Sequence, residues 1–294
     1  MSRRHVLIAG CGYVGQRLAV RLQQDFDVTS LVRTAERVAE LDRLGIRALA
    51  IDFDRVRAGV SIPERLDQEA ILYLTPPPVL GESDLRLDRF LQLASVPPHT
   101  FVYMSTTGVY GDTAGAAVDE SSPVQPRTDR ARRRVSAEEM TRVWCNERRV
   151  RRVVLRVPGI YGPDRLPLER LRHVEPVVRE REAGINNRIH VDDLVEACVR
   201  AMANPEARGV YNVTDGQPLS STAFINMVAK AAGLPLPPQV SMEEAQLTFS
   251  PERLSFLNES RRVSNERMLK HLGVVLKYAD VEAGIRASIP GVRT

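Results

Sequence analysis

Three glycines near the start of the chain have the spacing of a phosphate-binding loop. Gly10, Gly12 and Gly15 form a G-x-G-x-x-G pattern directly after a short apolar run and before residues with a helical period. The first glycine of such a loop permits a tight turn, the second lets the backbone approach a pyrophosphate, and the third lets helix and strand pack closely. We therefore expect the loop, including Tyr13 and Val14, to bind a dinucleotide at a helix N-terminus.

Arg33 and Arg37 indicate which dinucleotide the loop would take. An acidic residue at the end of the second strand accepts the ribose 2′-hydroxyl of NAD and repels the 2′-phosphate of NADP. Here that strand is followed by Arg33 and Thr34, and no carboxylate is available until Glu36. Because arginines form charge-assisted bonds to phosphate, NADP is favoured over NAD as the cofactor. The alternative interpretation is that both arginines are solvated surface side chains.

The apolar pattern predicts the elements that would position this loop. Short β-branched runs alternate with helical patterns over the first two-thirds of the sequence, and the runs are apolar enough to be covered on both faces. The predicted fold class is α/β, a Rossmann-type doubly wound parallel sheet with a small, mainly helical C-terminal lobe. Strands are expected at 5–9, 27–32, 46–51, 70–75, 100–104 and 152–157.

A change of pattern after Pro163 divides the chain into two parts. A segment rich in proline and arginine follows, and beyond position 217 the chain is helical and punctuated by prolines, with final helices expected at about 265–272 and 280–288. We predict that residues 1–165 with 187–217 form the NADP-binding Rossmann domain. Residues 166–186 with 218–294 would form a smaller lobe on the substrate side.

Composition and charge disfavour several classes of function. The 294 residues carry 41 basic and 37 acidic side chains, and the arginines between 127 and 156 are mixed with glutamates and not interleaved with stacking aromatics, so we expect no nucleic-acid partner. The longest uncharged stretch, 91–111, contains prolines and polar residues, so we expect no membrane span. Three cysteines without close spacing disfavour disulfides and a zinc site, which predicts a cytoplasmic protein without a bound metal.

Five motifs follow one another along nearly the whole chain. They are Gly-Cys-Gly-Tyr-Val-Gly at 10–15, Met-Ser-Thr-Thr-Gly-Val-Tyr-Gly at 104–111, Leu-Arg through Tyr-Gly-Pro at 155–163, Ile-His-Val-Asp-Asp at 189–193 and Val-Tyr-Asn-Val at 210–213. Together they resemble the extended short-chain dehydrogenases/reductases, the NAD(P)-dependent epimerase/dehydratase family. Their order and spacing make the resemblance specific for fold and cofactor.

The resemblance implies roles for several further residues. In that family a Ser or Thr three residues before the Val-Tyr-Gly triplet hydrogen-bonds the reacting oxygen, and Thr106 holds that position here. Asp52 matches a residue near the adenine, whereas Thr75 and Pro76 match the turn beside the phosphates and ribose. The alternative for Thr106 is an ordinary turn hydroxyl that satisfies a backbone group.

The central departure from the family concerns its Tyr-x-x-x-Lys pair, in which the lysine lowers the pKa of the proton-transferring tyrosine. Counting back from Glu138 places Arg130 at the tyrosine position and Arg134 at the lysine position. No tyrosine lies between positions 111 and 160, and no lysine precedes Lys230. Arginine remains protonated at physiological pH, so Arg130 could only stabilise charge. Arg134 could still hold a ribose hydroxyl or an anion.

Other side chains could carry the proton, namely Tyr110, Glu120, Tyr161 and His190, and the sequence does not choose among them. Tyr161 and His190 are also candidates for substrate contact. The alternatives are that Tyr161 is an aromatic packed in a turn and that His190 is structural, packed beneath a helix capped by one of the two aspartates that follow.

Two functions are compatible with these residues. The first is an NAD(P)-dependent oxidoreductase or epimerase-like enzyme, with NADP favoured, acting on an alcohol or carbonyl of a small metabolite. Arg130 and Arg134 would give it a preference for an anionic metabolite. Gly159 replaces a substrate-binding asparagine of many relatives, which puts sugar-nucleotide epimerisation in doubt. The alternative is a non-catalytic NADP-binding sensor or scaffold. The helix around 131–147 lies at the dimer face of relatives, which is compatible with a homodimer.

Overall fold

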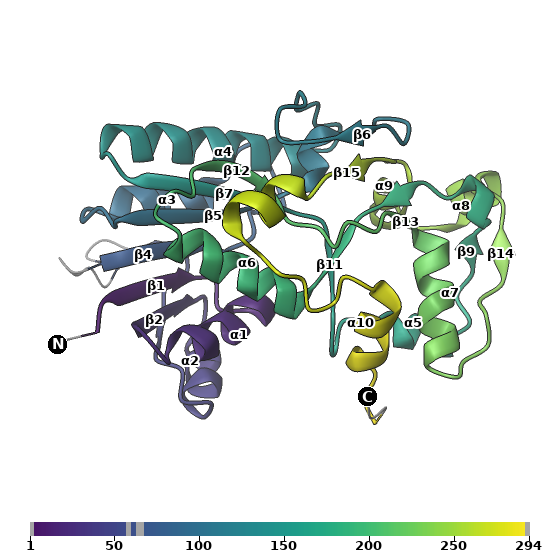
Figure 1. Ribbon diagram of the computed structural model, residues 1–294, viewed down its shortest axis with the longest axis horizontal. Coiled ribbons are helices and arrows are strands. Elements are labelled where there is room, and N and C mark those ends of the chain that lie inside the picture. The colour runs from purple at the N-terminus through teal and green to yellow at the C-terminus, as the bar shows by residue number, and fades with distance from the viewer. Residues whose placement is uncertain (1–2, 57–59, 63–67, 292–294) are drawn as a thin grey trace.

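A seven-stranded parallel sheet forms the centre of the molecule in the computed structural model, which describes residues 3–56, 60–62 and 68–291 (Figure 1). The strand order is β12-β7-β5-β4-β1-β2-β3, so the order reverses at β1, and a ligand crevice is expected beyond the carboxyl ends of β1 and β4. The predicted doubly wound α/β fold is confirmed. The strands are β1 (His5–Ala9), β2 (Asp27–Val32), β3 (Ala48–Ala50), β4 (Gln68–Tyr73), β5 (Thr100–Thr106), β7 (Arg151–Val157) and β12 (Gly209–Asn212).

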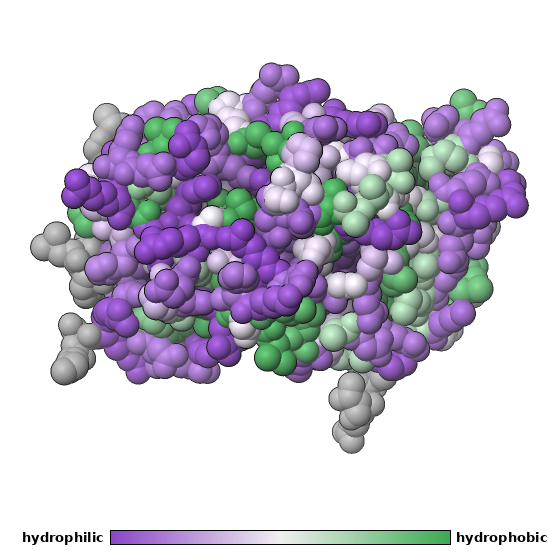
Figure 2. Space-filling model, turned by 45° about the horizontal axis from the view of Figure 1, so that its top comes forward, coloured by the Kyte–Doolittle hydropathy of each residue, from purple (hydrophilic) through white to green (hydrophobic). Residues whose placement is uncertain are grey.

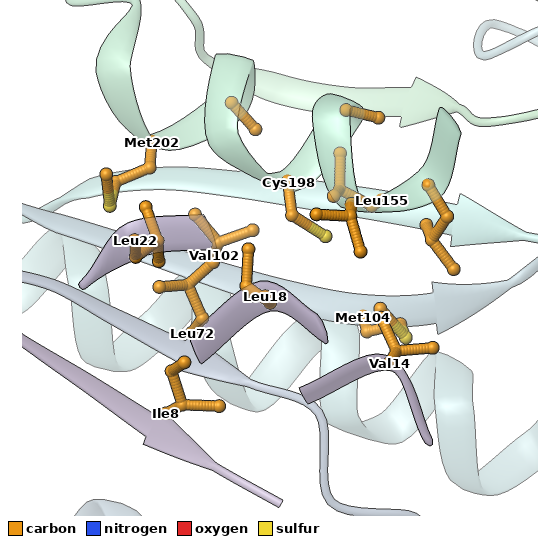
Figure 3. Close-up of a cluster of buried hydrophobic side chains, with 14 of the residues drawn as sticks. Ile8, Val14, Leu18, Leu22, Leu72, Val102, Met104, Leu155, Cys198 and Met202 are labelled. Carbon is orange, nitrogen blue, oxygen red and sulfur yellow. The ribbon is translucent and has the colours of Figure 1, made fainter. Parts of the chain in front are cut away.

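Helices cover both faces of this sheet, as its apolar strands require. On one face Leu18 and Cys198 belong to a buried cluster against the strands (Figure 3). On the other face Phe90 packs edge-on against Tyr73, and Trp144 packs against the same aromatic cluster. The first face is covered by α1 (Tyr13–Leu22), α2 (Ala35–Asp42) and α6 (Val191–Ala203), and the second by α3 (Leu85–Leu93) and α4 (Asp129–Glu147).

A smaller lobe lies beyond the carboxyl ends of the central strands (Figure 1). It has its own core, in which Tyr161, Phe224, Val228 and Ile285 are buried together. Its helices are α5 (Leu168–Arg172), α7 (Ser221–Ala231), α8 (Met242–Thr248), α9 (Pro251–Leu257) and α10 (Val281–Ser288). The short turn η2 (Glu180–Glu182) contacts α7, whereas η1 (Thr107–Tyr110) directly follows β5. Paired strands join its segments: β8 (Gly159–Tyr161) with β11 (Arg188–His190), β9 (Val177–Val178) with β14 (Gln239–Val240), and β10 (Ile185–Asn186) with β13 (Leu219–Ser220).

The C-terminal segment is not confined to this lobe, which differs from the predicted division of the chain. Met268, Leu272 and Val274 belong to the core on the α1 face of the sheet, and the helix predicted at 265–272 is a π-helix, η3 (Met268–Leu272). In addition, β15 (Arg262–Val263) pairs with β6 (Ala117–Val118). The apolar side chains between 268 and 274 therefore return the chain to the Rossmann domain, before α10 packs in the smaller lobe.

Two predicted strands are shorter or shifted. β3 has three residues in place of the predicted 46–51, and β4 ends at Tyr73 although the apolar pattern extends to Thr75. Pro76 and Pro77 have no backbone N–H for a ladder, so the strand gives way to a loop at the edge of the crevice.

The described residues contain no helix that is long and apolar enough to cross a bilayer. In the same part of the chain no three His, Cys, Asp or Glu side chains are grouped so that they could hold a metal ion, and the three cysteines are buried and free. Hydrophilic side chains cover most of the face shown in Figure 2, with apolar ones in small scattered groups.

Candidate active site

The geometry of the glycine loop explains, for each of the three positions, why a glycine stands there. Gly10 has a φ of +100°, and a Cβ atom added to it would lie 2.6 Å from Thr75 N. A Cβ on Gly15 would lie 2.6 Å from Gly10 O, whereas a Cβ on Gly12 would meet nothing within 4 Å. Gly12 is the N-cap of α1, and no side chain caps this helix. The amides at the start of α1 thus face open space, which fits a pyrophosphate.

A cavity of about 600 Å³ lies in front of this loop. It extends past the carboxyl ends of β1, β2 and β4, the crevice expected from the strand order. The cavity is lined by all ten residues that the sequence suggested for the cofactor: Gly10, Gly12, Tyr13, Val14, Gly15, Arg33, Arg37, Asp52, Thr75 and Pro76. Their contact with a cofactor remains a prediction, but the fold brings them together.

The two arginines proposed for the 2′-phosphate differ in their surroundings. Arg37 donates to Gln16 Oε1 at 2.9 Å and to Glu40 Oε2 at 2.7 Å, so its charge is partly neutralised. Arg33 is exposed and makes no ion pair within the described ranges of the chain. Of the two arginines, Arg33 is therefore the one whose guanidinium is available to bind a phosphate.

Sequence reasoning missed two arginines that line the same cavity. Arg86 is held by Asp54 at 2.6 and 2.7 Å and donates to Pro76 O at 3.0 Å, which fixes the loop after β4. Arg165 lies over the Tyr13 ring at 4.6 Å, and Tyr13 Oη donates to Pro163 O at 2.7 Å. The contacts of Tyr13 with Arg165 and Pro163 join the glycine loop to the segment after β8. No periodic pattern in the sequence predicts them.

A second cavity, of about 260 Å³, lies on the side of the smaller lobe and is lined by Thr106 and Arg130. Three elements contribute neighbouring residues to both cavities, so the cavities are adjacent. From β5, α4 and β8, the larger cavity is lined by Met104, Arg134 and Ile160. From the same three elements, the smaller cavity is lined by Thr106, Arg130 and Gly159. Side chains at the junction can therefore reach ligands in either space.

Comparison with known proteins places this arrangement in a family. Residues 6–214 match the NAD dependent epimerase/dehydratase family. The chain belongs to this family. A 3-diazoavenalumate denitrifying reductase from a Streptomyces species is 26% identical over 91% of this chain and 94% of its own.

Solved structures of similar proteins agree with the fold of this epimerase/dehydratase family member. A conserved protein of unknown function from Silicibacter pomeroyi is 30% identical, with a TM-score of 0.82 and 97% of each chain covered. A UDP-glucuronic acid 4-epimerase from Bacillus cereus, solved in complex with NAD, is 16% identical, with a TM-score of 0.75 and 97% of each chain covered. The latter likeness concerns the fold alone.

In this family member the two arginines that the motif spacing assigned to the Tyr-x-x-x-Lys positions line different cavities. Arg134 lines the larger cavity and donates from Nη1 to Tyr103 Oη at 3.1 Å and to Met104 O at 2.9 Å. Arg130 lines the smaller cavity, where its guanidinium lies 4.0 Å from the centre of the Phe256 ring. They share one face of α4, as their spacing predicts, but they serve separate spaces.

Thr106 stands at the end of β5 and caps η1. Its Oγ1 accepts from Gly108 N at 3.2 Å, which is the turn role that the sequence left open. The hydroxyl proton is not used in that bond, so Thr106 can also donate to a ligand in the smaller cavity that it lines.

The structure does not bring the other suggested proton carriers into either cavity. Tyr110 is buried and donates to Asn212 Oδ1 at 2.8 Å, and Glu120 accepts from Asn212 N at 2.7 Å. Tyr161 and His190 are buried against one another, with ring centres 5.2 Å apart. Tyr161 and His190 thus make packing contacts and line neither cavity, and their contact with a substrate stays a prediction.

His190 itself is the N-cap of α6, where the sequence favoured one of the aspartates that follow. Its Nδ1 accepts from Asp192 N at 3.1 Å, and its Nε2 lies 3.2 Å from Ser288 Oγ. Burial lowers the pKa of His190 to about 4, which keeps the imidazole neutral. A neutral ring can accept the N–H bond that a charged ring could not.

Asp215, which sequence reasoning also missed, is buried next to Arg188, and its backbone N–H donates to Arg188 O at 2.8 Å. It is 4% exposed, and its Oδ1 accepts from Gln217 N at 3.0 Å. Burial, with a smaller contribution from neighbouring Asp193, raises its pKa to about 7, although the Gln217 N–H bond and the positive charge of Arg188 oppose the shift. The folded protein therefore holds a proton on Asp215 where an unfolded chain would not.

We expect the stability of the wild-type protein to fall between pH 4 and pH 7 relative to Asp215→Asn. Over this range the unfolded state has lost the carboxyl proton that the folded state retains, so the free energy of unfolding decreases as pH rises and levels off above about 7. The difference should reach about 2–4 kcal/mol. Urea unfolding at several pH values measures it, and parallel curves for the two proteins would contradict the assignment. His190 is present in both proteins, so its titration does not contribute to the difference between them.

Proposed function

We propose that the protein is an NADP-dependent oxidoreductase or epimerase-like enzyme that acts on an alcohol or carbonyl group of a small anionic metabolite. The observation that carries this proposal is the adjacency of two cavities, one with a glycine loop for a dinucleotide and one with unpaired arginine charge. The family supports it, since the similar Streptomyces protein is a reductase and the Bacillus cereus epimerase was solved with NAD.

Residues of the larger cavity would hold the cofactor. The first amides of α1 would bind the pyrophosphate, Thr75 and Pro76 would lie beside phosphates and ribose, and Asp52 would lie near the adenine. Arg33 would bind the 2′-phosphate of NADP, because its guanidinium is free and no carboxylate stands at the end of β2.

We expect wild type to bind NADPH about tenfold to a hundredfold more tightly than NADH, since a charge-assisted bond contributes roughly 1.5–3 kcal/mol. Arg33→Asp should remove or reverse this preference. Arg43→Asp is the matched control, because Arg43 is exposed at the end of α2 and does not line the cavity. Calorimetric titration of both cofactors checks the result. Equal affinities in wild type would overturn the NADP assignment.

The side chains at the junction have complementary tasks. When bound, NADPH would supply a hydride to a carbonyl carbon. The Thr106 hydroxyl, whose oxygen already accepts the Gly108 N–H, would donate a hydrogen bond to the substrate oxygen, and the proton that the resulting alkoxide takes up would come from solvent. Arg134, anchored on Tyr103 and Met104 O, directs its remaining donors to the larger cavity. Arg130 stabilises negative charge and moves no proton, because it stays protonated.

The test of the enzyme is oxidation of NADPH, followed by absorbance, with a panel of small keto acids and aldehydes. Turnover supports the proposal, and tight binding of NADPH without turnover counts against it. A sensor or scaffold is the second candidate, because no Tyr, His or Lys is among the described residues that line the smaller cavity. Capture of a protein partner that depends on the redox state of the cofactor would support the sensor.

A further inference from the structure

Arg188 occupies the wall of the smaller cavity, although the sequence did not mark it as a site residue. It begins β11 and stands in register with Gly159 of β8. A Cβ added to Gly159 would lie 3.9 Å from Arg188 Cγ, so the glycine leaves open the space in front of this side chain. The guanidinium lies 4.1 Å from the centre of the Phe224 ring, which holds it in place from one side.

No side chain of the described residues forms an ion pair with Arg188, although nearby Asp215 favours its charged form. Within the described ranges no carboxylate oxygen lies within 4.0 Å of its guanidinium, and its hydrogen bond there is a long one, from Nη1 to Leu219 O at 3.4 Å. Arginine has five N–H donors, so most of them are free. Burial lowers the pKa of Arg188 to about 10, although nearby Asp215 and Tyr161 oppose this shift.

The charged side chains around Arg188 do not balance the positive charge in the cavity. Asp215, whose backbone N–H donates to Arg188 O at 2.8 Å, does not form an ion pair with the guanidinium. Arg261 is neutralised by two bonds of 2.8 Å to Glu259 Oε2. Arg130 also has no ion pair among the described residues, so two uncompensated arginines line one small space. An unpaired charge away from bulk water is unfavourable and attracts an anion.

We propose that Arg188, together with Arg130, binds the anionic group of the substrate, a carboxylate or phosphate, in the smaller cavity. The identity of this ligand as the substrate rests on the proposed function, but the anion site does not. Planar guanidinium groups bind the paired oxygens of such anions with two parallel hydrogen bonds. The cavity of about 260 Å³ is below the usual range of about 300–1,000 Å³ for ligand pockets, which favours a small anion over a nucleotide sugar.

The lining of the cavity suggests suitable probes. Phe256, Leu257 and Pro158 add apolar surface to the two arginines, so a probe should join an anion to an apolar body. Benzoate and phenyl phosphate meet this requirement and distinguish carboxylate from phosphate. Benzamide has nearly the same shape as benzoate without its charge, so it isolates the contribution of the anion.

The experiment is calorimetric titration of these probes into wild type and Arg188→Gln. Of the two anions, the one that binds wild type more tightly should bind Arg188→Gln at least about tenfold more weakly, which equals about 1.4 kcal/mol. The affinity for benzamide should be the same in both proteins. Arg181→Gln is the matched control, because Arg181 is 79% exposed in the same lobe and does not line the cavity. Failure of both anions to bind wild type at millimolar concentration, or equal binding by Arg188→Gln, would overturn the proposal.

A second variant guards against misfolding of the first. Gly159→Asn keeps Arg188 but places a side chain in the space in front of it, so it should also weaken binding of the anion. Binding of NADPH, measured in the same samples, separates the two proposals. If NADPH does not bind to wild type but Arg188→Gln still loses the anion, the anion site stands and the proposed function fails. If NADPH is bound and oxidised but neither variant affects the anion, this inference fails alone.

Discussion

Replacement of Gly12 by valine should lower the affinity for NADPH by at least about a hundredfold, about 2.7 kcal/mol, while the protein stays folded. The side chain would enter the open space in front of α1, where the pyrophosphate would lie. The backbone of Gly12, with a φ of −91°, does not require glycine, and a Cβ there touches no other residue. The packing of the fold therefore does not require a glycine at this position, which is what we expect where a ligand fills the space.

Gly10→Ala is the informative contrast to this variant. Gly10 has a positive φ, and an added Cβ would lie 2.6 Å from Thr75 N, so this substitution should destabilise the fold itself. Calorimetry measures NADPH affinity, and thermal unfolding followed by circular dichroism measures stability. Gly12→Val should lose binding with little change in melting temperature, and Gly10→Ala should lose stability. Tight NADPH binding by Gly12→Val would show that the loop does not cradle the phosphates.

Features that depend on local spacing could be predicted from the sequence. The three glycines, the β-branched runs and the order of the motifs were enough for the Rossmann fold and for the ten predicted residues around the larger cavity, but not for Arg86 and Arg165. These features are local because a strand, a tight loop and a helix N-terminus follow one another in the chain. The positions of Arg130 and Arg134 on α4 followed from the motif spacing in the same way.

Features that arise from contacts between distant segments could not be predicted. Arg188 faces the smaller cavity because β11 pairs with β8, and that ladder of three residues is too short to show a hydrophobic period. Arg165 reaches the glycine loop across a contact with Tyr13 that joins residues about 150 positions apart. The return of Met268 and Leu272 to the main core also depends on tertiary packing, because their apolar pattern fits either domain.

The second large effect concerns Glu138, which fixes α4 to the sheet. Its Oε1 accepts from Ser105 Oγ at 2.5 Å and from Arg156 Nε at 3.0 Å, and its Oε2 accepts from Arg156 Nη2 at 2.7 Å. The side chains of Arg156 and Glu138 are 7% and 12% exposed. Removal of the carboxylate would leave the Arg156 charge buried without its partner, which is strongly unfavourable. This contact also sets the position of Arg130 and Arg134 relative to β5.

We expect Glu138→Ala to reduce the free energy of unfolding by about 3–5 kcal/mol. Glu139→Ala is the matched control, because Glu139 is the next residue on the same helix and pairs with Arg142 where both side chains are at least half exposed. Its loss should cost less than about 1 kcal/mol. Urea unfolding of the two variants gives both values. If Glu138→Ala were no less stable than Glu139→Ala, the buried ion pair would not be what holds α4, and with it Arg130 and Arg134, against the carboxyl ends of the strands.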